Sequence, residues 1–130
     1  MAAKSTYASN RALEYLLRSG SVYVALFTTL PDVDDAGGVE VSATGTAYAR
    51  KLVVFNAASG AQCVNSADLI WAQATASWGA VAAFGLYDAL TGGNQLYADP
   101  LPGGAVTIST GSGYGDQFMI PAGTLQVSEA

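Results

Sequence analysis

Residues 81–98 read VAAFGLYDALTGGNQLYA, and they decide the fold class. Two apolar runs, 81–88 and 95–98, flank a turn at residues 91–94 (TGGN). Gly and Asn adopt the backbone conformations that join antiparallel strands, so this spacing predicts a β-hairpin. The hairpin is the starting point for our prediction of a mainly β protein.

Similar short apolar runs occur on both sides of this hairpin. Residues 21–28 (SVYVALFT) are apolar at nearly every position, which predicts a strand buried on both faces. The other predicted strands are 46–55, 61–64, 69–71, 105–109, 117–120 and 124–127, and residues 31–44 form a loop. Strands at intervals of roughly 8–12 residues favour an antiparallel β-sandwich, jelly-roll-like, over alternating β-α-β units.

One short helix is predicted near the N-terminus. Ser5 or Thr6 can cap it, apolar residues recur at helical spacing, and Ser19-Gly20 ends it. We therefore predict a single domain over 1–130, with an N-terminal arm and helix over 1–20 and a β body over 21–130. The apolar stripe comprises Ala8, Ala12, Leu13, Leu16 and Leu17.

The leucine stripe has two interpretations, because a short helix persists only when it docks on a surface. Leu13, Leu16 and Leu17 either cap the β body of their own subunit or anchor the arm and helix on another protein. They are therefore candidate interface residues.

The composition argues against catalysis. Only 12% of the residues are charged, against about a quarter in an average soluble domain, and the chain has no histidine. Serine–histidine and cysteine–histidine pairs are therefore absent, and so is the commonest general base. We expect no enzyme and no cofactor.

The charges and the lone cysteine exclude several further classes. Five basic residues against ten acidic ones give a net charge of −5, which argues against nucleic acid and anionic membrane as partners. We also expect no transmembrane segment and no secretion signal. Cys63 is the one cysteine, so it cannot form an internal disulfide.

An acidic loop carries the candidate metal ligands. Asp32, Asp34 and Asp35 precede Gly37 in a spacing like the start of an EF-hand calcium loop. Position five of such a loop, which carries a ligand, is Ala36 here, and Ala43 stands at position twelve, where the bidentate glutamate belongs. We therefore predict a solvated acidic loop, with the three aspartates as the candidates for a metal.

Two charges interrupt the predicted strand 46–55. Arg50 and Lys51 are adjacent, so their side chains are expected on opposite faces of the strand. One interpretation is an inward charge that protects a sheet edge. The other is a salt bridge to a neighbouring subunit, with an acid such as Asp68 as its partner. Tyr114, in the glycine-rich loop 110–115, is a further candidate for contact between subunits.

Ordered motifs across nearly the whole chain resemble small structural proteins of tailed bacteriophages. In this sequence the matching positions are 48–50 (YAR), 65–68 (NSAD), 77–79 (SWG), 84–88 (FGLYD), 91–94 (TGGN) and 122–123 (AG). The resemblance implies a component of the virion.

Within that class we predict a capsid decoration or cement protein on the head surface. Such proteins are commonly small β-sandwiches, often trimeric, that stabilise the head by binding across capsid subunits. The expected partners are the major capsid protein and identical copies, in a homotrimer made in the host cytoplasm. One alternative is a small tail- or fibre-associated subunit bound to tail proteins. The other is a host-surface binding module that uses either a calcium-loaded Asp32–Asp35 loop or the aromatic residues Trp71, Trp78, Tyr87 and Tyr97. The 24 alanines and sparse charges are typical of surface covered by other subunits.

Overall fold

The computed structural model describes residues 2–110 and 115–129. It has one helix followed by short strands. The helix α1 is Thr6–Arg18, and the strands are β1 (Val22–Thr29), β2 (Val39–Glu40), β3 (Lys51–Val53), β4 (Gln62–Val64), β5 (Leu69–Ile70), β6 (Gly79–Val81), β7 (Ala83–Tyr87), β8 (Gln95–Pro100), β9 (Val106–Ile108), β10 (Met119–Ile120) and β11 (Gln126–Ser128).

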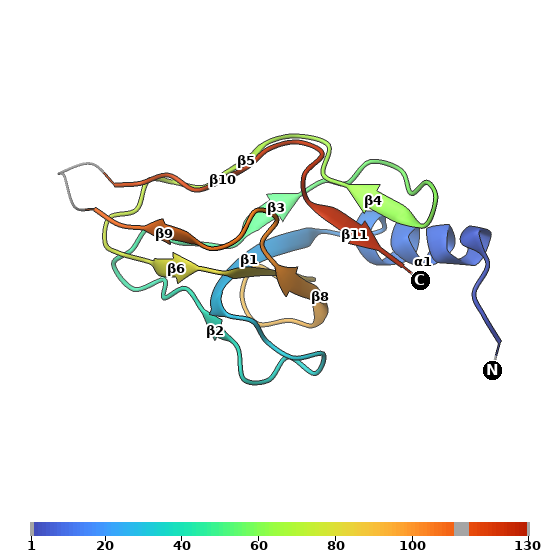
Figure 1. Ribbon diagram of the computed structural model, residues 1–130, viewed down its shortest axis with the longest axis horizontal. Helices are drawn as coiled ribbons and strands as arrows, with labels where there is room; N and C mark the ends of the chain where they lie inside the picture. Colours follow the sequence, from blue (N-terminus) through green and yellow to red (C-terminus); the bar gives the residue numbers. More distant parts are fainter. Residues whose placement is uncertain (1, 111–114, 130) are drawn as a thin grey trace.

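A five-stranded antiparallel sheet forms the base of the molecule (Figure 1). Its order is β2-β1-β7-β8, and β3 also pairs with β1. β3 pairs with the start of β1 and β2 with its end. The predicted hairpin is confirmed, because β7 and β8 pair through the turn.

Three two-stranded ribbons, β5–β10, β4–β11 and β6–β9, complete the β structure. A bridge between Phe55 and Asn65 joins the chain after β3 to β4. The Asp116 amide donates to the Ser109 carbonyl, which joins β9 to β10, and β6 runs into β7 through Ala82. Sheet and ribbons therefore form one nearly continuous wall around a core.

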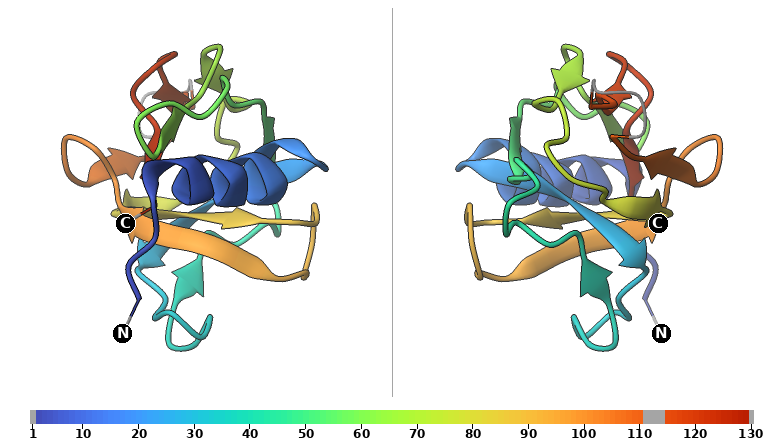
Figure 2. Two further views of the ribbon diagram at one scale, coloured as in Figure 1. Left: turned by 90° about the vertical axis from the view of Figure 1, so that its right-hand side faces the viewer. Right: turned by 90° about the vertical axis from the view of Figure 1, so that its left-hand side faces the viewer.

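Helix α1 lies across one end of this wall (Figure 2). The β4–β11 ribbon is above it and the five-stranded sheet below it in that view. Ser5 caps the helix by accepting from the Ala8 amide at 3.1 Å, and Arg18 pairs with Glu14 at 2.6 Å. The prediction of a mainly antiparallel β protein with one short N-terminal helix is confirmed.

Alternating residues of β1 serve two clusters on opposite faces of the sheet. Val24 and Leu26 point into the main core, together with Leu86 of β7. Ala25 and Phe27 point the other way, into a small cluster with Ala83 and Tyr87. This explains why residues 21–28 are apolar at both odd and even positions, which face opposite sides of the sheet.

Three predicted boundaries were wrong. Of the strand expected over 46–55, only Lys51–Val53 form β3, and Phe55 adds an isolated bridge. The left-handed φ of 62° at Ala47 breaks the extended backbone near the start of this stretch. The run 81–88 divides at Ala82, whose amide donates to the Phe27 carbonyl between two pairings. The loop 31–44 contains β2, which pairs with β1.

Candidate assembly surface

Arg50 is held within its own chain. Its side chain is 8% exposed, and its Nε and Nη2 atoms each donate to a carboxylate oxygen of Glu40 at 3.0 Å. Nη1 donates to the carbonyls of Ala89 at 3.0 Å and Gly92 at 2.7 Å. The guanidinium therefore ties the chain before β3 to β2 and to the turn between β7 and β8.

Two tyrosines complete this arrangement, which we call the Arg50 centre: Glu40, Tyr48, Arg50 and Tyr87. The Arg50 guanidinium lies 4.1 Å from the centroid of the Tyr87 ring, a cation–π geometry. The Tyr48 hydroxyl donates to Glu40 at 2.6 Å and accepts from the Leu26 amide at 3.0 Å. Burial raises the pKa of both phenols, so both stay protonated donors at neutral pH.

Gly85 makes room for this centre. A β-carbon there would lie 2.8 Å from the Tyr87 ring and 3.0 Å from the Phe27 ring. These two rings stack at a centroid distance of 6.2 Å. A glycine at this point of β7 therefore lets the two aromatic rings cover the sheet.

Three of the six phage-like motifs contribute to the Arg50 centre. Tyr48 and Arg50 come from the YAR motif, and Tyr87 and Gly92 come from the FGLYD and TGGN motifs. Asp88 accepts from the Asn94 amide at 2.7 Å, and this bond holds the pKa of the Asp88 carboxyl below its usual range. These motif residues therefore build the fold.

The sequence did not reveal the Glu40 partner of Arg50. The sequence leaves open an edge-protecting charge or an intersubunit salt bridge, and the structure places the Arg50–Glu40 ion pair within the chain. Asp68, the suggested partner, instead accepts from the Ala122 amide at 2.8 Å. Lys51 is exposed on β3, and no ion pair joins it to the carboxylates that the structure describes.

Two of the three candidate metal ligands make hydrogen bonds within the chain, one to its own loop and one to β7. Asp32 accepts from the amides of Asp34 at 2.8 Å and Ala36 at 3.1 Å, while Asp35 accepts from the Tyr87 hydroxyl. Within residues 2–110 and 115–129, no three His, Cys, Asp or Glu side chains gather closely enough to hold a metal ion. The EF-hand-like spacing thus folds into a turn capped by Asp32.

The remaining sequence-derived candidates have different positions. Leu13 and Leu17 are buried in the core of their own chain and Leu16 packs against it, which leaves the first two no exposed surface for a neighbour. Trp71 and Trp78 are also buried, so neither offers an open ring for sugar stacking. Tyr114 lies outside the described residues. In the part of the chain that is described, no helix is long and apolar enough to cross a membrane.

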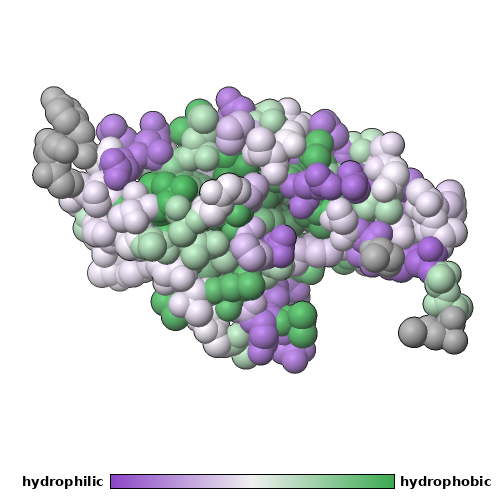
Figure 3. Space-filling model, in the orientation of Figure 1, coloured by the Kyte–Doolittle hydropathy of each residue, from purple (hydrophilic) through white to green (hydrophobic). Residues whose placement is uncertain are grey.

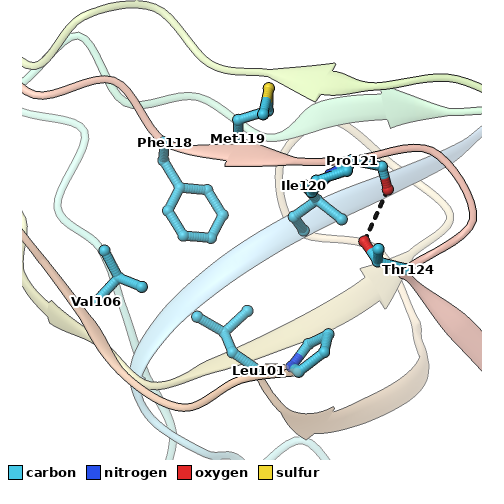
Figure 4. A pocket seen from close by; sticks show the side chains of 8 residues that line it. Leu101, Val106, Phe118, Met119, Ile120, Pro121 and Thr124 are labelled. Atoms are coloured by element: carbon cyan, nitrogen blue, oxygen red, sulfur yellow. Dashed lines mark hydrogen bonds between the residues drawn. The ribbon is translucent and has the colours of Figure 1, made fainter.

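An apolar groove opens beside the β5–β10 ribbon (Figure 4). It encloses about 210 Å³ and is lined by Leu101, Pro102, Val106, Phe118, Met119, Ile120, Pro121 and Thr124. Val106 and Met119 are nearly half exposed, and Met119 lies opposite the exposed Ile70 across the ribbon.

The groove lining offers no group for acid–base chemistry. None of the eight side chains titrates, and the Thr124 hydroxyl donates to the Pro121 carbonyl at 2.7 Å. Such a hollow can bury an apolar side chain of a partner. Much of the face seen in Figure 3 is pale, with separate green and purple patches rather than one charged field. The surface therefore favours packing over chemistry.

The match that identifies the family spans residues 3–128, and the family is described as Podophage GP4 fiber I protein gp80. The chain belongs to this family. The resemblance to structural proteins of the phage virion is thereby confirmed. No curated protein matches the chain. The family description names a fibre, whereas the head decoration that we predicted does not appear in it.

Proposed function

We propose that the protein is a small tail- or fibre-associated structural subunit of a podophage virion. The observation that carries this proposal is the match to a podophage fibre family over nearly the whole chain. It favours the tail alternative over the capsid decoration that we preferred from the sequence. The chain has no repeats or heptads for a fibre shaft, so we propose a globular subunit attached to other tail proteins.

The proposed mechanism is association without catalysis. The sequence has no histidine, the Arg50 guanidinium is fully engaged, and the groove residues do not titrate. The exposed apolar residues and the groove are suited to burial against tail proteins and identical copies. Several such contacts add to high avidity even when each is weak.

The test is a phage that lacks this protein. We expect its heads to keep their resistance to heat and osmotic shock, while adsorption to the host falls. Supplying the wild-type chain in trans should restore adsorption, which is the control for polar effects on neighbouring genes. Heads that become fragile, with adsorption unchanged, would instead support capsid decoration.

A further inference from the structure

The outward face of α1 carries three aligned side chains that its own fold does not use. Tyr7, Arg11 and Tyr15 are spaced four residues apart, so they form one stripe opposite the buried Leu13 and Leu17. Tyr7 is 71% exposed and Tyr15 is 74% exposed. We call these three residues the tyrosine ridge. Tyr and Arg are the residue types enriched where protein interfaces gain most of their affinity.

The ridge carries an unused positive charge. The Arg11 guanidinium lies 6.0 Å from the Tyr7 ring centroid. Lys4 pairs with Glu129 and Arg18 with Glu14, but no ion pair joins Arg11 to any carboxylate in residues 2–110 and 115–129. Residues 1–20 carry a formal charge of +2, and residues 21–130 carry −7. Helix α1 itself carries +1, from Arg11 and Arg18 against Glu14, so it is a positive segment of an acidic chain.

The loop between β1 and β2 offers the complementary surface. Val33 is 93% exposed, and it stands between Asp32 and Asp34. Asp32 uses one carboxylate oxygen within the loop, while the Asp34 carboxylate bonds to none of the described residues. We call Asp32, Val33 and Asp34 the acidic tip. It presents an apolar side chain flanked by negative charge.

The ridge and the tip lie far apart on one molecule. Figure 1 has α1 at the right-hand end and the β1–β2 loop at the lower edge, and the side views of Figure 2 agree. A contact between them therefore has to join two copies.

We propose that the tyrosine ridge of one copy binds the acidic tip of a second copy. Arg11 pairs with Asp34 across the contact, and Val33 packs between the rings of Tyr7 and Tyr15. The two surfaces differ, so the contact is head-to-tail, and repeating it yields a ring or a filament. This contact goes beyond the proposed location in the virion and does not depend on it.

Charge-reversal variants of the full chain test the contact by native mass spectrometry and sedimentation. Arg11→Glu and Asp34→Arg should each weaken self-association by roughly tenfold or more, because each places like charges together. An equimolar mixture of the two variants should associate again, since every contact between unlike copies then joins opposite charges. Lys51→Glu makes the same charge change on β3, away from the ridge, and should leave association unchanged.

A cross-linking experiment locates the contact independently. When a Tyr15→Cys chain is mixed with a Val33→Cys chain, we expect a disulfide-linked heterodimer. The native Cys63 is buried and should not take part. Val54→Cys, at a site that is 64% exposed, replaces Val33→Cys in the control mixture and should not cross-link.

Several results would overturn the proposal. They are a wild-type chain that stays monomeric, variants that associate normally, a mixture that fails to recover, or cross-linking no stronger than in the Val54→Cys control. If Arg11→Glu left self-association intact but reduced incorporation into virions, the ridge would bind a different virion protein. Retained binding to tails by a strictly monomeric chain would leave the proposed function standing without this contact.

Discussion

The two faces of the five-stranded sheet are both buried, but by different chemistry. The inner face carries Val24, Leu26 and Leu86, and the ribbons and helix cover it with further apolar side chains. The outer face carries Phe27 and Tyr87, over which the Arg50 centre lies. The inner face packs into a core of aliphatic and aromatic side chains. The outer face carries a network of ionic, cation–π and backbone contacts centred on one arginine.

The two faces differ in how freely their side chains can be exchanged, which indicates a structural role for several of the phage-like motif residues. Aliphatic side chains of similar volume can replace one another in a core at modest cost. A bidentate arginine stacked on a ring cannot be replaced in this way, because its donors and plane fit one arrangement. Arg50 and Tyr87, from the YAR and FGLYD motifs, build the outer-face contacts, whereas Phe84 and Leu86 of FGLYD pack into the main core.

The largest expected effect comes from removing the Arg50 side chain. Arg50→Ala should lower the free energy of unfolding by about 4 kcal/mol, because it leaves two carbonyls unpaired, leaves Glu40 with the Tyr48 hydroxyl alone and removes the cation over the Tyr87 ring. Urea unfolding measures this, with the exposed neighbour Lys51→Ala as the matched control. A loss below about 1 kcal/mol would mean that the pair behaves as an ordinary surface salt bridge.

A substitution on the inner face should cost less than the loss of Arg50. Leu26 is fully buried, so Leu26→Ala should cost about 3 kcal/mol through lost burial and the cavity left behind. Leu26→Met keeps most of the volume and should cost less than about 1.5 kcal/mol. Equal losses for the two variants, again by urea unfolding, would argue against tight packing on this face.

Gly85→Ala tests the close approach on the outer face. Its new β-carbon would meet the rings of Tyr87 and Phe27, so we expect a loss of about 2 kcal/mol from overpacking. Thermal unfolding followed by circular dichroism gives the change. In the double variant Gly85→Ala with Phe27→Leu, the smaller side chain should relieve part of the loss. A double variant no more stable than Gly85→Ala would mean that the strain does not come from contact with the Phe27 ring.

The smallest effect concerns pH. Burial raises the pKa of Tyr48 and Tyr87 above the ordinary value of about 10. Above pH 10 the unfolded chain releases these protons more readily than the folded one, so stability should fall as pH rises. The contribution of the two phenols to stability should be fully present below pH 10. Tyr87→Phe should reduce the slope above pH 10, and an unchanged slope would exclude Tyr87 as its source.

Local patterns predicted much of the fold. The Ser5 cap, the helix stripe and the glycine-containing hairpin each depend on residues close in sequence, and each is found in the structure. The strand predicted over 46–55 was too long: Ala47 breaks the extended backbone near its start, and no periodicity in apolar residues signals such a residue. The Arg50–Glu40 pair was missed because it depends on β2, a two-residue strand hidden in a polar loop.

The candidate surface was harder to predict than the fold. Leu13 and Leu17 were interface candidates because an amphipathic stripe can pack against its own chain or against another protein. The structure places both in the core of their own chain. The sequence pattern does not distinguish Tyr7, Arg11 and Tyr15, because exposed polar and aromatic residues on the outer side of a helix are common. Their significance depends on burial of the opposite face and on which charges are paired, which only the fold determines.

The most direct test of the central claim is the position of the protein in the virion. Purified particles are separated into heads and tails, and the copy number in each fraction is measured by quantitative mass spectrometry against the major capsid protein. We expect the protein in the tail fraction, at a copy number comparable to the tail proteins. Its recovery with heads, at a copy number approaching that of the major capsid protein, would contradict a tail or fibre role.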